Sequence, residues 1–151
     1  SRSSAASDVY KRQALIKNII ADFNGIIFLV GDKTEEELCD DILNNIQSNK
    51  VISLAGQLNI RQLSAFLSSA KLVIGNDSGV MHLASACGAA TISIFGPTLD
   101  NWTSPFLNNT VIAKNISCRP CYLQLTYGCG NPICMDIEVE DVYRVVKTKL
   151  M

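Results

Sequence analysis

The sequence predicts an α/β domain of the Rossmann-like, three-layer type with a parallel sheet. Segments with helical periodicity alternate regularly with short segments suited to strands. The strand segments are apolar throughout, as expected of parallel strands that helices cover on both faces. Polar turns, such as the one over residues 75–79, separate strands from helices. Right-handed crossover helices should therefore connect the parallel strands.

The first expected elements are the end of a helix and a buried strand. Apolar residues gather on one side of a helix over residues 14–23, which Asn24 and Gly25 should end. The continuous apolar run 26–30 is typical of a strand buried on both faces.

Two capping boxes predict the next two helices. Thr34 with Glu37 should begin a helix that runs to about residue 47, and Asn59 with Gln62 should begin one that runs to about residue 69. A short strand over 51–54 is expected between them.

The second half of the chain continues the alternation. A strand over 71–75 precedes an alanine-rich helix over 78–87, which Gly88 should end, and 91–95 is another buried strand. The remaining expected elements are a strand over 110–113 and an amphipathic helix over 139–150.

The composition is that of a folded domain with a substantial core. Hydrophobic residues make up 48% of the chain and charged residues 18%. A net charge of −1 argues against a nucleic-acid partner, whose phosphates would require a basic surface. No apolar run approaches the length that spans a bilayer. No Gly-x-Gly-x-x-Gly follows an expected strand, which disfavours a dinucleotide oxidoreductase.

The first thirteen residues are expected to be foreign to the domain. Residues 3–13 resemble the translation of a widely used sequencing adapter, and such segments are excluded from reasoning about the fold. The domain is then expected to comprise residues 14–151 and to be truncated at its N-terminal side.

The segment 73–84 carries the strongest indication of a binding site. A β-branched run ends in a Gly-Asn-Asp-Ser-Gly turn, and an apolar helix follows at once. Ligands of open α/β folds bind at the carboxyl ends of the strands. The N–H groups of Ser78, Gly79 and Val80 should be unpaired donors at a helix N-terminus, which suits a phosphate. The Ser78 hydroxyl should cap the helix or bind the ligand, and an ordinary capped turn is the alternative.

Three stretches of the sequence add to the evidence for a binding site. They are Asp77–Ala84, then Ile92–Thr98 with Trp102 and Pro105, and then Cys118–Cys121 with Cys129, Cys134, Met135 and Ile137–Val139. In this order and spacing the chain resembles glycosyltransferase family 9, the bacterial ADP-heptose:lipopolysaccharide heptosyltransferases. The resemblance covers roughly residues 26–146, and it implies the C-terminal, donor-binding half of a two-domain (GT-B) glycosyltransferase.

The resemblance implies a donor, an acceptor and a place of action. The donor is ADP-heptose, and the acceptor is the lipopolysaccharide inner core, which the N-terminal half would bind while supplying the general base. No catalytic residue and no required cofactor are expected in this chain. The family's basic residue for the leaving diphosphate lies upstream of Ala14, so we expect the chain to be inactive alone. The complete protein would invert the anomeric carbon at the cytoplasmic face of the inner membrane, as a peripheral protein.

Asp77 and His82 belong to the same segment as the expected phosphate site. The resemblance favours contact between Asp77 and hydroxyls of the donor sugar, because a carboxylate does not favourably face a diphosphate. An Asx-type bond that holds the turn is the alternative. His82, the only histidine, would assist the phosphates as imidazolium or make a structural hydrogen bond.

Further donor contacts are expected after other strands. In the family an acidic residue at about the position of Glu35 and Glu36 contacts the ribose, and the sequence leaves open which of the two corresponds. Favourable contact with a helix dipole is their alternative role. Gly56 and Leu58 are expected to form an adenine shelf. Gly96, with Pro97 and Thr98, should line the cleft unless these residues only make a turn.

Four of the six cysteines crowd into one segment, at positions Cys118, Cys121, Cys129 and Cys134. This spacing is close to that of a metal knuckle and permits a structural Zn²⁺ held by four thiolates. Free buried thiols, labile disulfides and a loop staple are the alternatives. Cys39 and Cys87 fall in expected helices and should not bind metal.

Two other functions stay open. A nucleotide-sugar epimerase shares the two-domain fold, but it needs acid and base residues in its cleft. A non-catalytic Rossmann-like binding module stapled by zinc is the second alternative.

Overall fold

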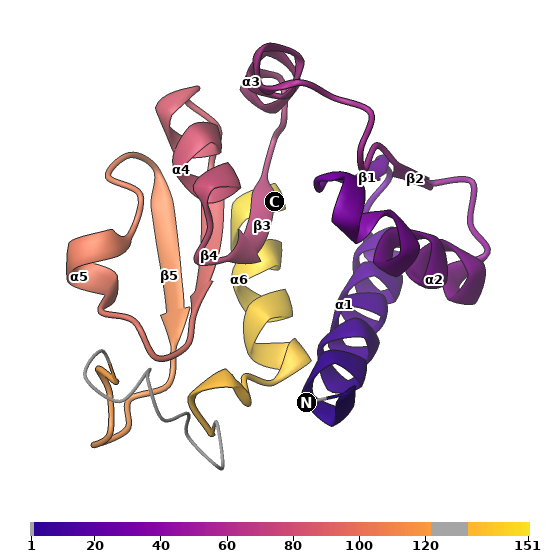
Figure 1. Cartoon of the computed structure of the whole chain (residues 1–151). Helices are drawn as coiled ribbons and strands as arrows, with labels where there is room; N and C mark the ends of the chain where they lie inside the picture. The colour runs from indigo at the N-terminus through magenta and orange to yellow at the C-terminus, as the bar shows by residue number, and fades with distance from the viewer. Residues whose placement is uncertain (1, 122–132) are drawn as a thin grey trace. The chain divides into compact units, whose positions relative to one another are not determined.

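The computed structural model describes residues 2–121 and 133–151 of the chain (Figure 1). The chain divides into two compact units. One comprises Ser1–Ile60 with Glu138–Tyr143, and the other comprises Arg61–Ile137 with Arg144–Met151. Each unit has its own parallel sheet, so the strand pairing is parallel as expected. Hydrogen bonds nevertheless divide the described strands into two sheets rather than one.

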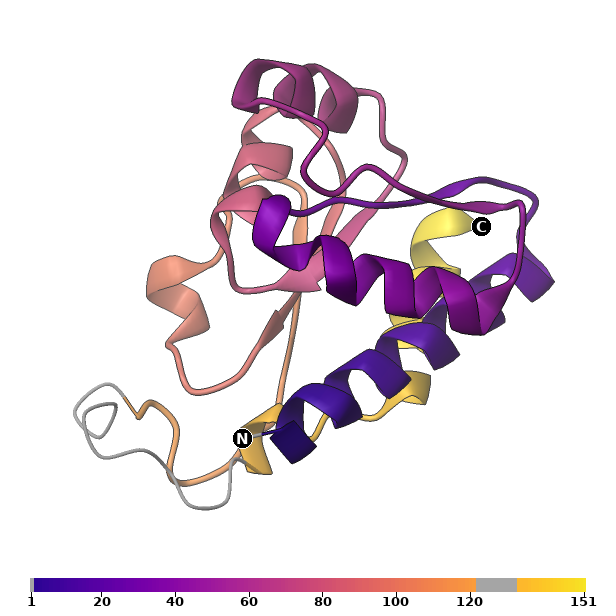
Figure 2. The ribbon, with the colours of Figure 1, turned by 45° about the vertical axis from the view of Figure 1, so that its right-hand side comes forward.

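The first unit packs two helices on a two-stranded sheet. β1 (Ile27–Leu29) pairs in parallel with β2 (Val51–Ser53). α1 (Arg2–Asp22) and α2 (Glu36–Ile46) pack against each other, as Figure 2 shows. Their shared core contains Ile16, Ile42 and Val51, with Val9, Ile20 and Ile27 among the residues at its edge.

α1 is longer than the helix expected from the sequence. It runs without interruption from Arg2, so residues 2–13 share one helix with residues 14–22. Arg12 pairs with Asp8 one turn away, at 3.1 Å between Nη2 and Oδ2. Pairs at this spacing add a little helix stability, which helps to explain why the helix continues through this polar stretch.

The start of α2 corrects the expected capping box. Asp32, not Thr34, is the cap: its carboxylate accepts from the Thr34 N–H at 2.7 Å, and Glu35 accepts from the Asp32 N–H at 3.1 Å. This box begins a short 3-10 turn over Lys33–Glu35 that leads into α2. Aspartate caps better than threonine, and Asp32 also accepts from the Thr34 hydroxyl at 2.6 Å.

The capping role of Asp32 predicts a pH-dependent stability. Its bonds from Thr34 hold the pKa of Asp32 below the usual value. A carboxyl whose pKa is lower in the folded state stabilises the fold above its ordinary pKa of about 4 and loses that contribution as the pH falls through the lowered value. Asp32→Ala should therefore lower the free energy of unfolding at pH 7, and the difference from wild type should shrink at about pH 2.5.

Urea denaturation at both pH values measures this difference. Glu37→Ala is the matched control, because Glu37 is an exposed acidic residue in the first turn of α2 that takes no part in the observed capping box. A Glu37→Ala loss as large as that of Asp32→Ala would contradict the observed cap.

The second unit is built on a three-stranded parallel sheet of order β3-β4-β5. The strands are β3 (Val73–Asn76), β4 (Thr91–Phe95) and β5 (Asn109–Ala113). The helices that follow β2, β3 and β4 are α3 (Ile60–Ser68), α4 (Gly79–Ala86) and α5 (Asp100–Thr103). Of these, α5 was not expected from the sequence. A further 3-10 turn covers Ile133–Met135.

β4 is the most buried strand of the second unit. Ile92 and Phe95 have no exposed surface, and neither do Thr91 and Ser93. The two hydroxyls donate to one acceptor, the Asn109 Oδ1 of β5, at 2.8 Å each. The strand is therefore not apolar throughout as expected, and its buried polar groups are paired, as burial requires.

α6 (Val139–Leu150) has the bounds expected from the sequence. Its buried residues Val142, Tyr143 and Val146 recur at the spacing of one helix face. Within the first unit, the Tyr143 hydroxyl donates to the Asp22 carboxylate at the end of α1, and this bond raises the pKa of Tyr143 to about 12.

Candidate functional site

The turn between β3 and α4 is built as the sequence predicts. β3 ends at Asn76, and the Asp77 N–H extends the ladder by donating to the Ile94 carbonyl at 3.1 Å. Ser78 is extended, and its carbonyl accepts from the N–H groups of Met81 and His82. Ser78 is thus the N-cap residue of α4, and the turn sits at the carboxyl end of the strand.

Gly75 allows α4 to pack closely behind this turn. A Cβ built on Gly75 would lie 2.8 Å from the Met81 sulfur, closer than real side-chain contacts. Met81 is 1% exposed and packs with Leu67, Val73 and Ala84 in the core of the second unit. The start of α4 therefore packs directly on the buried core of the second unit.

The N-terminus of α4 presents unpaired donors. Among the residues that the structure describes, none accepts from the N–H groups of Ser78, Gly79 or Val80. Ser78 holds the N-cap position, but its hydroxyl makes no capping bond, so of the two roles expected for the hydroxyl only ligand binding stays a prediction. Ser78 and Gly79 are exposed, and a Cβ on Gly79 would meet nothing within 4 Å. Unpaired N–H groups together with the helix dipole favour an anion at this point.

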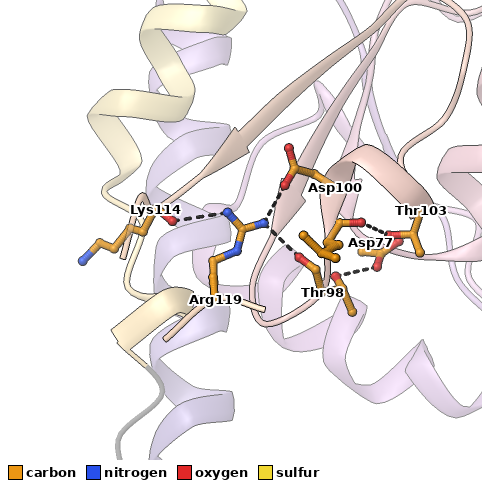
Figure 3. Close-up of polar contacts among 7 residues, drawn as sticks. Asp77, Thr98, Asp100, Thr103, Lys114 and Arg119 are labelled. Carbon is orange, nitrogen blue, oxygen red and sulfur yellow. Dashed lines mark hydrogen bonds and ion pairs between the residues drawn. The ribbon is translucent and has the colours of Figure 1, made fainter. Parts of the chain in front are cut away.

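Asp77 is held by the loop that follows β4. Its Oδ2 accepts from the Thr98 hydroxyl at 2.9 Å (Figure 3). The alternative expectation, an Asx-type bond inside the turn, is not among its contacts with the described residues. Asp77 is half-buried, and no described residue donates to its Oδ1. One carboxylate oxygen is therefore fixed, and the other is available to a ligand hydroxyl.

His82 and Gly96 lie in different surroundings. His82 is exposed on α4, and within the described chain its imidazole has no hydrogen-bond partner, so the expected structural bond does not form there. Gly96 is buried, and a Cβ built on it would overlap the Met135 sulfur. Gly96 therefore allows Met135 to pack closely on the loop after β4.

The first unit holds the other expected donor contacts. The Glu35 carboxylate is engaged in the capping box and is exposed, whereas Glu36 is half-buried. A Cβ built on Gly56 would overlap Glu36 Oε1, so this carboxylate lies against the loop after β2. The Gly56 N–H donates to the Gly31 carbonyl at 3.0 Å, and Gly56 has a φ of +69°, which favours glycine. Leu58, in the same loop, is half-buried.

The described cysteines do not assemble a metal site. Cys118 is exposed, and Cys121 and Cys134 are buried. The Cys121 thiol donates to the Cys118 carbonyl at 2.9 Å. No group of three or more potential ligands occurs within residues 2–121 and 133–151, and Cys129 lies outside them. The four-thiolate zinc site therefore stays a prediction.

The sequence analysis missed Arg119 as a residue of the site, and it expected Thr98 only as part of the turn that lines the cleft. The Arg119 guanidinium donates to the Thr98 carbonyl, and Thr98 in turn donates to Asp77. Both residues lie inside the stretches that carry the family resemblance, but sequence spacing alone does not reveal which groups they contact.

A membrane-spanning helix is not found among the described residues, because none of their helices combines the length and the apolar composition that a bilayer requires.

These features define a Rossmann-like α/β protein with a candidate anion site at a helix N-terminus. The chain belongs to glycosyltransferase family 9 (heptosyltransferase), whose family model matches residues 10–129. That match begins at Tyr10 and so includes the last four residues, 10–13, of the segment expected to be foreign.

The curated relatives are heptosyltransferases. The chain is 35% identical over 130 residues to lipooligosaccharide heptosyltransferase 2 of Campylobacter jejuni, which covers 83% of this chain and 40% of that protein. It is 33% identical over 152 residues to lipopolysaccharide heptosyltransferase 1 of Campylobacter coli. This match covers 96% of this chain and 44% of that protein. The chain thus spans less than half the length of these relatives.

Solved structures of the family share the fold. The E. coli ADP-heptose lps heptosyltransferase II superposes with a TM-score of 0.77 at 23% identity, over 94% of this chain and 41% of that one. The family 9 glycosyl transferase of Veillonella parvula superposes with a TM-score of 0.76 at 19% identity, over 95% of this chain and 40% of that one. The expected fold, one Rossmann-like half of a GT-B glycosyltransferase, is confirmed.

Proposed function

We propose that this chain is the donor-binding half of a heptosyltransferase and that it binds ADP-heptose. The observation that carries the proposal is the trio of unpaired N–H groups at the start of α4, beside the half-buried carboxylate of Asp77. Two structures of similar fold are described as an ADP-heptose enzyme and as a heptosyltransferase with ADP. Family membership favours neither an epimerase nor a zinc-stapled binding module.

Each group at the start of α4 has a role in this proposal. Transfer of heptose makes ADP the leaving group, so negative charge grows on the diphosphate in the transition state. The N–H groups of Ser78, Gly79 and Val80 are oriented before the reaction and would stabilise that charge. The exposed His82 imidazole, when protonated, would add a positive charge. Asp77 Oδ1 would accept from a hydroxyl of the heptose.

In the first unit, we assign the ribose contact to Glu36 rather than Glu35. The Glu35 carboxylate already accepts from the Asp32 N–H. Glu36 lies against Gly56, in the loop expected to contact adenine. A carboxylate that accepts from a vicinal diol is the usual ribose contact of Rossmann-like sites.

The complete protein would transfer heptose, with inversion, to the lipopolysaccharide core at the cytoplasmic face of the inner membrane. The acceptor and the general base would belong to a second half, so the present chain should bind the donor without turning it over. We expect no cofactor requirement.

Titration calorimetry of the chain with ADP, UDP and GDP tests the donor assignment. We expect weak binding of ADP, with a Kd of about 1 mM, because only part of the complete enzyme's contacts is present. UDP and GDP should bind more weakly than ADP, and pyrophosphate should compete with ADP at α4. UDP or GDP binding as strong as ADP binding would contradict the adenine assignment, and failure of pyrophosphate to compete would contradict the phosphate site.

A further inference from the structure

The loop that follows β4 is held from the C-terminal side of the chain at three of its four residues, Gly96, Pro97 and Thr98. Met135 packs on Gly96. The Cys121 N–H donates to the Pro97 carbonyl at 2.9 Å. Arg119 Nη2 donates to the Thr98 carbonyl at 2.9 Å. We call these three residues, Arg119, Cys121 and Met135, the strap of this loop.

Arg119 is the charged centre of the strap. Its side chain is only 13% exposed and pairs with Asp100 Oδ1 of α5 at 2.9 Å. Its other terminal nitrogen donates to the Lys114 carbonyl at 3.3 Å. One planar guanidinium thus joins α5, the loop after β4 and the segment after β5 (Figure 3). Lysine has no such fork of donors, so it would not reproduce these bonds.

Thr98 connects the strap to Asp77, the residue proposed to bind the donor sugar. The Thr98 carbonyl is fixed by Arg119, and its hydroxyl donates to Asp77 Oδ2. A carboxylate with one oxygen fixed loses less conformational freedom when its other oxygen binds a ligand. Support of this kind decides how accurately a binding group is placed.

We propose that Thr98 and Arg119 are positioning residues that hold the Asp77 carboxylate ready for the donor sugar. This inference rests on the proposed function, because the sugar is the ligand that Asp77 would contact. Neither residue needs to touch the donor: Arg119 places Thr98, and Thr98 places Asp77. Their effect should therefore appear in the affinity that the heptose adds to ADP, and not in the affinity for ADP itself.

Thr98→Val tests the chain of contacts with little change in shape. Calorimetry should measure the Kd of ADP and of ADP-heptose for the wild type, for Asp77→Ala and for each positioning variant. Asp77→Ala gives the full size of the sugar contribution. Loss of one hydrogen bond corresponds to about a three- to tenfold effect, so Thr98→Val should weaken ADP-heptose by about that factor and leave ADP unchanged. Thr98→Ser, which keeps the hydroxyl, should restore the wild-type affinity.

Thr103→Val is the matched control. The Thr103 hydroxyl also donates a hydrogen bond, to the Leu99 carbonyl at 2.8 Å, but this bond does not involve Asp77. It should leave both affinities unchanged. Arg119→Lys should reproduce the Thr98→Val loss for ADP-heptose, and melting curves will show whether either variant unfolds.

The outcomes separate this inference from the proposed function. If the wild type gains no affinity from the heptose, the assignment of Asp77 to the sugar fails and the positioning role fails with it. If Asp77→Ala removes the gain but folded Thr98→Val keeps it, only the positioning role is overturned. A Thr98→Val variant that weakens ADP and ADP-heptose equally would also overturn it, because the bond would then support the fold in general.

Discussion

Gly79→Asp should abolish ADP binding and leave the fold as stable as before. Gly79 is exposed, its backbone needs no positive φ, and a Cβ there meets nothing within 4 Å. A carboxylate in the first turn of α4 would interact favourably with the helix dipole, so the melting temperature should stay the same or rise. The same carboxylate would occupy the position of the diphosphate and repel it. Because like charges in contact cost several kcal/mol, we expect the Kd of ADP to rise by about 100-fold or more.

Gly79→Ala is the control for this variant. It adds the same Cβ without the charge and should change the ADP affinity by only about two- to threefold. Calorimetry measures the affinities, and thermal denaturation measures the stability of both variants. If Gly79→Asp bound ADP as well as the wild type does, the diphosphate would not lie at the start of α4.

Phe95→Ala should remove a large part of the stability of the second unit. Phe95 ends β4 and has no exposed surface. Truncation of a buried phenylalanine to alanine costs about 3–5 kcal/mol, because apolar contacts are lost and a cavity remains. Natural domains have only about 5–15 kcal/mol of stability in total, so a substantial fraction of the variant should be unfolded at 37 °C.

Phe106→Ala is the matched control, since the Phe106 side chain is 97% exposed. It should change the free energy of unfolding by less than about 0.5 kcal/mol. Urea denaturation followed by circular dichroism compares the two variants. A similar loss at both positions would contradict the observed burial of β4.

The elements with strong local patterns were predicted well. β4 and α6 have the expected bounds, and the apolar runs before the polar turns became parallel strands. Periodicity and turn residues act within a few positions of each other, so they can be read along the chain. The division of the strands into two sheets depends on which edges meet, and no local pattern encodes that choice.

Within the site, the limits of prediction from sequence have the same physical origin. Ser78 was predicted as the N-cap residue of α4, because cap position follows from the residues beside it. The capping box of α2 was placed two residues too late, since Asp32 and Thr34 both suit a cap and only the observed bonds decide. The Asp77–Thr98–Arg119 contacts join residues 21 positions apart at each step, and their partners emerge only from the packing of three loops.

The amide of Asn109 determines how β5 aligns beside β4. Val111 lies two residues after Asn109 and so faces the same side of the sheet. Because the adjacent Ile112 is also apolar, hydrophobicity alone would allow Ile112 to face that side instead. A slip of one residue would turn every side chain of β5 to the opposite face. It would also carry the Asn109 oxygen away from the Thr91 and Ser93 hydroxyls and leave two buried donors without an acceptor. Three polar side chains, two on β4 and one on β5, thus favour a single alignment of the two strands.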